Sequence, residues 1–239
     1  MRLDQRMVAE GLAPSRARAQ ALIAAGVVRV GGQAAVKASS KAEGAIQVIG
    51  DPCPWVSRAG LKLDHALDVF GLSPSGIALD LGASTGGFTQ VLLARGAEHV
   101  HALDVGHGQI DAALAADPRV SVHEGVNARA IPAGLVPPVD WITADLSFIS
   151  LEKALPSALA LARAGAWLVA LIKPQFEAGR EAIGRGGIVS DPAVHRAVCA
   201  RVAAFLTDRG WQVSGQVPSP ITGSDGNREF LIAACLLKN

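Results

Sequence analysis

From about residue 58 onward, the chain alternates between short β-prone runs and helical segments, and this rhythm constrains the fold more than any other feature. The β-prone runs are IALDL, HVHALDV, VSVH, VDWITADL and AWLVALI. Helices are predicted over 59–70, 88–95, 108–115, 151–164 and 192–209. Such alternation predicts an α/β fold with a mainly parallel sheet and helices on both of its faces. The last two runs, WQVSGQV and EFLIAACLL, have no helix between them and predict a terminal antiparallel hairpin.

The first fifty residues predict a separate, small α+β module. Apolar residues at helical spacing indicate a first helix that Gly11 ends, and a second helix is expected from Pro14 to Ala25 with Ser15 as its N-cap. VVRV and IQVIG, on either side of a Gly-Gly turn, are typical of short strands. The predicted organisation is therefore an N-terminal domain over 1–50, a proline-containing linker over 51–57 and the α/β domain over 58–239.

Composition narrows the functional classes. The longest apolar run, AGAWLVALI, has nine residues, far fewer than the roughly 20 that span a bilayer. The N-terminus, MRLDQRMVAEG, lacks the apolar core of a signal peptide. Three widely spaced cysteines form no metal-ligand pattern. We therefore expect a cytoplasmic protein that works without a membrane.

The net charge of +1 conceals an asymmetry along the chain. Residues 1–62 contain nine basic and four acidic residues, a balance of +5, and the remainder carries −4. A basic head predicts contact with a polyanion, although a solvated helix face would show the same charges. The residues expected to contact phosphates are Arg2, Arg6, Arg16, Arg18 and Arg29.

A glycine-rich turn, GASTGG, follows the first β-prone run of the α/β domain. Open α/β sheets bind ligands at the carboxyl ends of their strands, and glycines let the backbone approach a ligand closely. Asp80 stands just before the turn, where a carboxylate suits a cationic ligand better than a pyrophosphate. Asp104 closes the next strand, where a carboxylate commonly accepts hydrogen bonds from ribose hydroxyls. S-adenosylmethionine has the required cationic groups and ribose, and a tight turn without a ligand is the alternative.

Two polar residues at strand ends are candidates for catalysis. Asp145 ends the fourth strand and Lys173 ends the fifth, and we expect these two strands to flank the first, so that both side chains face one crevice. A lysine in such a place can act as a base once its amine is neutral. The alternatives are a lysine that reaches solvent and an aspartate that caps the next helix. Asn127 occupies a position suited to contact with adenine, but asparagine is also common in turns.

Several separated motifs together resemble the FtsJ-like RNA ribose 2′-O-methyltransferases. The motifs, in order, are Ser57-Arg58-Ala59-x-x-Lys62, Asp80 to Phe88, Asp145, Lys173-Pro174 and Asn227-x-Glu229-Phe230. The segment RLDQRMVAEGLAPSRARAQALIAAGVVRVGG resembles an S4-type RNA-binding domain, and GRGGIVSDP and GNREFLI strengthen the likeness. Over nearly its whole length the chain resembles the TlyA (hemolysin A) family of rRNA 2′-O-methyltransferases.

The resemblance implies an enzyme that uses S-adenosylmethionine to methylate a cytidine ribose in rRNA, with rRNA or ribosomal subunits as its partners. It implies a Lys-Asp-Lys-Glu tetrad of Lys62, Asp145, Lys173 and Glu229. The residues expected to bind the cofactor are Asp80, Gly82, Ala83, Ser84, Thr85, Gly86, Gly87, Phe88, Asp104, Asn127 and Asp145. Ser15 and Arg58 join the five arginines of the basic head as expected RNA contacts. No metal is expected, because the methyl donor is already activated by its positive sulfur.

One departure from the related sequences bears on the target. Related heat-shock rRNA methyltransferases usually have proline in the glycine turn where this chain has Ser84-Thr85, which leaves the precise nucleotide open. The competing hypotheses are a ribosome-associated RNA-binding protein with a silent methyltransferase domain, a membrane-lytic hemolysin and an NAD-linked dehydrogenase. The oligomeric state is not predicted.

Overall fold

The computed structural model describes residues 1–13, 15–35, 37–50 and 53–237. The chain divides into two compact units, Met1–Pro54 and Trp55–Asn239. Pro14, the predicted start of the second helix, and Asp51 and Pro52 of the predicted linker lie outside the described residues. No helix in the described part of the chain is long and apolar enough to cross a membrane.

The N-terminal unit packs two helices against a small antiparallel sheet. Its elements are α1 (Leu3–Ala9), α2 (Arg16–Ala24), β1 (Val28–Val30), β2 (Gln33–Ala34) and β3 (Ile46–Val48), with strand order β2-β1-β3. Ser15 is the N-cap of α2, as predicted, and its Oγ accepts a hydrogen bond from the Arg18 backbone N–H at 3.2 Å. Met7, Leu22 and Val28 are among the buried residues that join the helices to the sheet.

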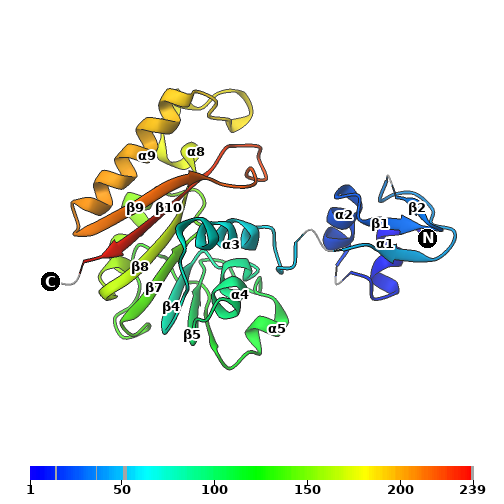
Figure 1. Cartoon of the computed structure of the whole chain (residues 1–239), viewed down its shortest axis with the longest axis horizontal. Coiled ribbons are helices and arrows are strands. Elements are labelled where there is room, and N and C mark those ends of the chain that lie inside the picture. Colours follow the sequence, from blue (N-terminus) through cyan, green and yellow to red (C-terminus); the bar gives the residue numbers. More distant parts are fainter. Residues whose placement is uncertain (14, 36, 51–52, 238–239) are drawn as a thin grey trace. The chain divides into compact units, whose positions relative to one another are not determined.

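The second unit is built on a seven-stranded sheet (Figure 1). Its strands are β4 (Ile77–Leu81), β5 (His99–Leu103), β6 (Val120–His123), β7 (Val139–Ala144), β8 (Ala162–Ile172), β9 (Trp211–Pro218) and β10 (Phe230–Leu236). The order is β6-β5-β4-β7-β8-β10-β9, and all pairs from β6 to β8 are parallel. β10 is antiparallel to both neighbours, which confirms the predicted mixed sheet and its terminal hairpin.

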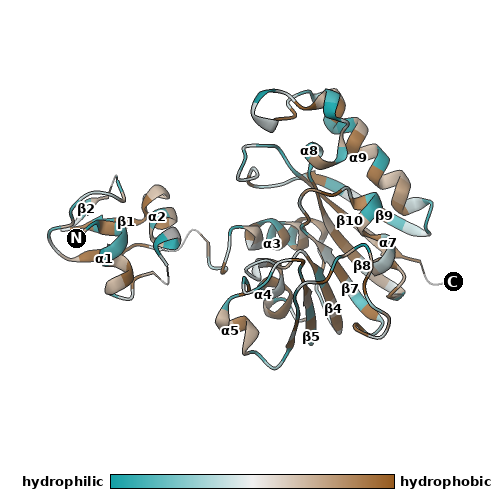
Figure 2. Ribbon diagram, turned by 180° about the vertical axis from the view of Figure 1, so that it is seen from behind, coloured by the Kyte–Doolittle hydropathy of each residue, from teal (hydrophilic) through white to brown (hydrophobic). Residues whose placement is uncertain are grey.

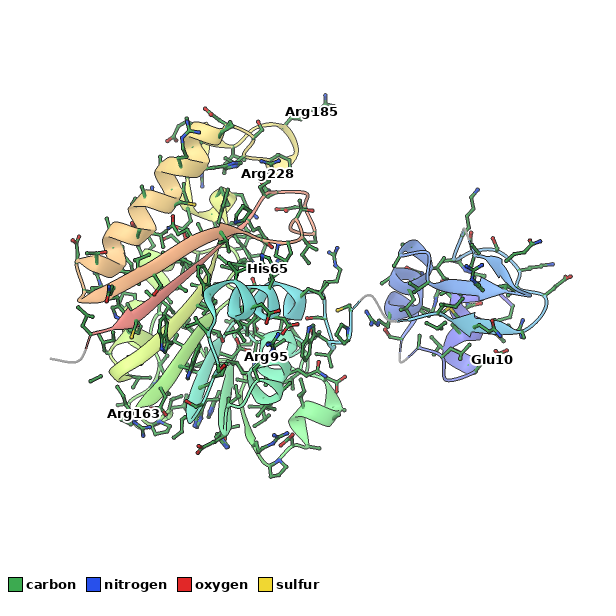
Figure 3. All side chains as sticks on the ribbon, in the orientation of Figure 1. Glu10, His65, Arg95, Arg163, Arg185 and Arg228 are labelled. Atoms are coloured by element: carbon green, nitrogen blue, oxygen red, sulfur yellow. The ribbon has the colours of Figure 1, made fainter. Side chains whose placement is uncertain are left out.

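Helices cover both faces of this sheet. They are α3 (Ala59–Phe70), α4 (Gly87–Ala94), α5 (Ala112–Ala115), α6 (Leu151–Ala154), α7 (Pro156–Leu159), α8 (Pro174–Glu177) and α9 (Pro192–Thr207), with 3₁₀ turns η1 (Arg180–Ala182) and η2 (Arg185–Gly187). The apolar faces of α3 and α4 form one core with the sheet, and α6, α7 and α9 form a second core on the other face. The apolar strands therefore lie between helical layers (Figure 2), and side chains fill the space on both faces (Figure 3).

Three local predictions need correction. The helix predicted over 108–115 begins only at Ala112, because Asp111 caps it by accepting a hydrogen bond from the Ala113 N–H. The helix predicted over 151–164 is two short helices that break at Pro156, which has no N–H to donate, and β8 already begins at Ala162. Of the fourth and fifth strands, which were both expected to flank the first, only the fourth (β7) does so; β8 lies beyond β7, and the other neighbour of β4 is β5.

Candidate active site

Four charged side chains from distant parts of the chain meet in one cavity of about 330 Å³. Lys62 comes from α3, Asp145 follows β7, Lys173 follows β8 and Glu229 precedes β10. Lys62 Nζ lies 2.5 Å from Glu229 Oε2, and Lys173 Nζ lies 2.6 Å from Asp145 Oδ1. The structure thus brings the predicted tetrad together as two ion pairs. The expected shared crevice for Asp145 and Lys173 is present although β8 is one strand further from β4 than predicted.

The tetrad is largely shielded from water. Lys62, Lys173 and Glu229 are 7%, 9% and 4% exposed. Burial raises the pKa of Glu229, and hydrogen bonding and charge from Lys62, together with the charge of Lys173, act in the opposite direction. Each cation has an acidic partner, which buried charges require. Such paired groups can hold a polar substrate in one orientation and exchange protons with it.

Ser147 is a site residue that the sequence reasoning missed. Lys173 Nζ donates a hydrogen bond to Ser147 Oγ at 3.0 Å, so the amine has an aspartate on one side and a hydroxyl on another. Ser147 lines the tetrad cavity and both of the cavities that adjoin it. Its place two residues beyond Asp145, in DLS after a strand, was the available signal.

A second cavity of about 710 Å³ opens beside the tetrad at the carboxyl ends of β4 and β5. Asp104 accepts hydrogen bonds from the backbone N–H groups of Ser84 at 2.8 Å and Gly106 at 2.7 Å. These bonds aim the carboxylate at the glycine-rich turn and leave lone pairs for further donors. Among the residues predicted to bind cofactor, this cavity is lined by Gly82, Ser84, Asp104, Asn127 and Asp145.

The other predicted cofactor residues are distributed differently. Ala83, Thr85 and Phe88 line the tetrad cavity, whereas Gly86 and Gly87 line neither cavity. Gly87 instead lets the chain pack closely, since a Cβ there would lie 2.2 Å from Ser57 Oγ. Gln109, which sequence reasoning missed, also lines the larger cavity, and its Oε1 lies 3.3 Å from Ser84 Oγ.

Asp80 does not reach either cavity. It is fully buried, and its carboxylate accepts hydrogen bonds from Thr89 Oγ1 at 2.7 Å and Thr143 Oγ1 at 2.9 Å. Burial raises the pKa of Asp80 to about 6, and the two threonine hydroxyls oppose this shift. Asp80 was expected to contact the cofactor, but its side chain has no surface in either cavity. This carboxylate instead links β4 to α4 and β7.

The larger cavity fits S-adenosylmethionine on the chemistry of its lining. Its volume lies within the range of about 300–1,000 Å³ typical of small-molecule sites. Asp104 offers acceptors for ribose hydroxyls, and apolar side chains such as Val126, Leu146 and Ile149 offer contact for a flat base. At the turn, a Cβ on Gly82 would lie only 2.5 Å from the Asp145 carbonyl oxygen, so glycine is required for this close approach.

The predicted RNA contacts of the N-terminal unit are mostly engaged within the protein. Buried Asp4 forms ion pairs with Arg2 and Arg16, each at 3.1 Å. The pKa of Asp4 is lowered, chiefly by the side-chain hydrogen bond from Arg2 and also by those from Gln20 and Arg16. Arg6 pairs with Glu10 at 2.5 Å, Arg18 donates to the Cys53 carbonyl, and Ser15 caps its helix.

Two of the predicted RNA contacts are exposed and form no ion pair with any residue that the structure describes. Arg29 donates only a 3.3 Å hydrogen bond to the Gly32 carbonyl within the described part of the chain. Arg58, in the second unit, is exposed and lines the tetrad cavity. These two arginines are therefore the most available of the seven predicted contacts for a polyanion.

The parallel sheet, the cavity at its glycine-rich turn and the Lys-Asp-Lys-Glu cluster together define the class of Rossmann-like methyltransferases. Residues 55–235 match the family of FtsJ-like methyltransferases, and residues 1–44 match the S4 domain. The chain belongs to the TlyA family of FtsJ-like methyltransferases that carry an N-terminal S4 domain. Both predicted resemblances are confirmed.

Individual relatives support the same assignment. The 16S/23S rRNA (cytidine-2′-O)-methyltransferase TlyA of Mycobacterium tuberculosis is 45% identical over 97% of this chain and 88% of its own length. Hemolysin A of Brachyspira hyodysenteriae is 41% identical over 97% of this chain and 98% of its own length. A solved structure from Streptococcus thermophilus, designated a hemolysin, is 40% identical, with a TM-score of 0.76 over 99% of this chain and 88% of that one.

Proposed function

We propose that this protein transfers a methyl group from S-adenosylmethionine to the ribose 2′-hydroxyl of a cytidine in ribosomal RNA. The observation that carries the proposal is the pair of ion pairs, Lys62–Glu229 and Lys173–Asp145, in a cavity that adjoins the 710 Å³ cavity at the glycine-rich turn. The cytidine target comes from the printed activity of the Mycobacterium tuberculosis relative. The S4 domain supports RNA as the substrate.

S-adenosylmethionine, when bound, supplies a methyl group activated by a positive sulfur. The residues that would hold it are Asp104 at the ribose, the backbone of the turn at Gly82 and Ser84, and Asn127 at the adenine. Leu146 and Ile149 would exclude water beside the base. This leaves the tetrad cavity for the ribose that is methylated.

A ribose hydroxyl is a weak nucleophile, so the protein must orient it and remove its proton. Lys173, as the neutral amine, would take the proton of the 2′-hydroxyl onto Nζ while the 2′-oxygen gains the methyl group. Asp145 and Ser147 would hold the amine in place. Lys62 and Glu229 would orient the ribose. General-base catalysis contributes roughly 10²–10⁴-fold, and positioning contributes roughly 7–11 kcal/mol in favourable systems.

RNA recognition would be shared between the two units. Phosphate contacts through the basic head would position the enzyme without reading sequence, and Arg58 would contact the substrate at the cavity itself. Ribosomal RNA or a ribosomal subunit is therefore the proposed partner. The place of action that we infer from this partner is the cytoplasm.

Two substitutions of Lys173 test the assignment of the base. Lys173→Ala removes the amine, and Lys173→Arg keeps a cation beside Asp145 that cannot lose its proton. We expect both variants to lose at least 100-fold in methyl transfer and to bind S-adenosylhomocysteine nearly as wild type does. The measurements are incorporation of tritiated methyl groups into ribosomal subunits, mass-spectrometric mapping of 2′-O-methyl groups and calorimetric titration. Normal turnover of either variant would exclude Lys173 as the base.

A further inference from the structure

We propose that Gln175 reads the base of the target nucleotide, accepting a hydrogen bond from the exocyclic amino group of cytosine and thereby rejecting uracil. This inference rests on the proposed function and adds a residue that determines specificity. It concerns a third cavity, of about 390 Å³, which adjoins the tetrad.

The third cavity is the size and character of a base pocket. It shares Ser147, Lys173 and Glu229 with the tetrad cavity, and its other walls include the rings of Phe148 and Phe176. A base is attached to the sugar carbon next to the one that carries the 2′-hydroxyl. A nucleoside whose hydroxyl reaches Lys173 must therefore place its base in a space that adjoins the tetrad.

The tetrad cavity itself is the poorer place for the base. Its lining includes Arg58, Lys62 and Thr222, which are charged or polar. Such a surface suits the phosphates of the substrate strand. The third cavity, with two aromatic rings and Ile183, suits a flat, largely apolar ring.

Gln175 carries a hydrogen-bond acceptor that the protein leaves unused. The residue is 8% exposed and lines this cavity. Its Nε2 donates to Asp225 Oδ2 at 3.1 Å, whereas its buried Oε1 accepts no hydrogen bond from any residue that the structure describes. A buried acceptor without a partner is costly, which indicates that a ligand supplies the missing donor.

Asp225 determines the orientation of the Gln175 amide. Its carboxylate accepts hydrogen bonds from the Asn227 backbone N–H at 3.0 Å and from Asn227 Nδ2 at 2.8 Å. Burial acts to raise the pKa of Asp225, but the hydrogen bonds from Asn227 and Gln175 outweigh it and lower the pKa. An ionised carboxylate only accepts hydrogen bonds, so Gln175 must direct Nε2 toward it and is left with Oε1 for the base.

This arrangement distinguishes the two pyrimidines. Cytosine carries an amino group, a donor, at the position where uracil carries a carbonyl oxygen. An acceptor with a carboxylate behind it attracts the amino group and repels the carbonyl, in the same way that acidic side chains read the amino group of cytosine in a nucleic-acid groove. A site built around such a bond rejects a ligand that cannot make it, because the buried acceptor is then left without a partner.

The test compares two substrates with two matched variants. Once the modified nucleotide has been mapped, rRNA is prepared with cytidine or with uridine at that position. Gln175→Met removes both polar atoms at nearly constant volume. The control is Gln216→Met on β9, where Nε2 donates to the Cys199 carbonyl at 2.8 Å. We expect wild type and the control to prefer cytidine in kcat/KM by roughly tenfold or more. In Gln175→Met that preference should fall toward one, chiefly through loss of activity on cytidine.

A second measurement separates this inference from the proposed function. Short oligonucleotides with a central cytidine or uridine are titrated against each protein in the presence of S-adenosylhomocysteine. Absence of methylation by wild type on either RNA would overturn the proposed function, whereas the oligonucleotide preference would still test the pocket. An unchanged cytidine preference in Gln175→Met, or an equal loss on both substrates, would overturn the role of Gln175.

Discussion

Asp80 shows, at the scale of one residue, how burial decides what a carboxylate does. Its position before the glycine turn suggested contact with a cationic ligand, but the side chain points into the protein and holds Thr89 and Thr143. Those two hydroxyls come from α4, which follows the turn, and from β7, the strand that pairs with β4. Asp80 therefore stabilises the turn whose residues line the 710 Å³ cavity.

The raised pKa of Asp80 predicts a pH-dependent contribution to stability. The unfolded carboxyl ionises near 3.8, whereas the folded one ionises near 6. A raised folded pKa stabilises the protein below the unfolded value, and this contribution disappears as the pH rises through 6. From pH 4 to pH 7, wild type should lose on the order of 2–3 kcal/mol of unfolding free energy relative to Asp80→Asn. Denaturant titrations of both proteins at several pH values measure this difference, and parallel profiles would contradict it.

Residues whose roles depend on individual hydrogen bonds, made or missing, could not be predicted from the sequence. Lys62, Asp145, Lys173 and Glu229 could be named because their motifs occur in a characteristic order. Ser147 and Gln175 stand in neighbouring motifs, but their significance depends on one contact made by Lys173 and one acceptor left free beside Asp225. No spacing rule predicts either fact.

At the scale of elements, the turn after β4 brings two strand ends close enough to build the site. Gly82 has φ +78°, and a Cβ on it would lie 2.5 Å from the carbonyl oxygen of Asp145. The Asp145 N–H in turn donates to the Leu81 carbonyl at 3.0 Å. The absence of a side chain at Gly82 thus positions Asp145, the aspartate of the proposed tetrad, as well as the turn.

Substitution of Gly82 should therefore lower the stability of the protein and weaken ligand binding in the 710 Å³ cavity that we propose for the cofactor. Gly82→Ala combines a strained φ with a clash against backbone, and we expect roughly 2–4 kcal/mol of destabilisation and at least tenfold weaker binding of S-adenosylhomocysteine. Gly108→Ala is the matched control, since φ is +63° but no atom lies within 4 Å of the added Cβ. It should cost only about 1–2 kcal/mol and leave binding unchanged. Thermal unfolding and calorimetric titration report the two effects, and equal behaviour of the variants would contradict the close-approach argument.

Predictions of helices and strands succeeded where the local sequence pattern determines the element, and they failed where tertiary packing determines it. α3 was predicted at its observed bounds, and every strand except the two-residue β2 was predicted, because apolar spacing and β-prone runs are local signals. The strand order was predicted incorrectly for β8, since which strands become neighbours depends on how α6, α7 and α9 pack across the sheet. The predicted helix over 151–164 failed because Pro156 and the early start of β8 were overlooked.

At the scale of the whole molecule, net charge cannot attract RNA, but the distribution of charge can. The chain carries only +1 overall, with +5 in residues 1–62. Three arginines of this segment pair with acids that the balance already counts, because Asp4 holds Arg2 and Arg16 and Glu10 holds Arg6. The field available to a phosphate therefore arises chiefly from exposed basic groups that have no acidic partner among the described residues, such as Arg29 in the N-terminal unit.

This distribution predicts a specific change in the salt dependence of RNA binding. Each phosphate neutralised by the protein releases counterions, so the logarithm of the affinity falls linearly with the logarithm of the salt concentration. Arg29→Gln should weaken binding and lower that slope by about one. Arg119→Gln is the control, since Arg119 lies in the methyltransferase unit and already pairs with Asp117 at 2.8 Å. It should leave the slope unchanged. Filter binding of rRNA fragments over a range of potassium chloride concentrations measures both variants, and an Arg29→Gln slope equal to that of wild type would show that the N-terminal unit does not hold RNA through this charge.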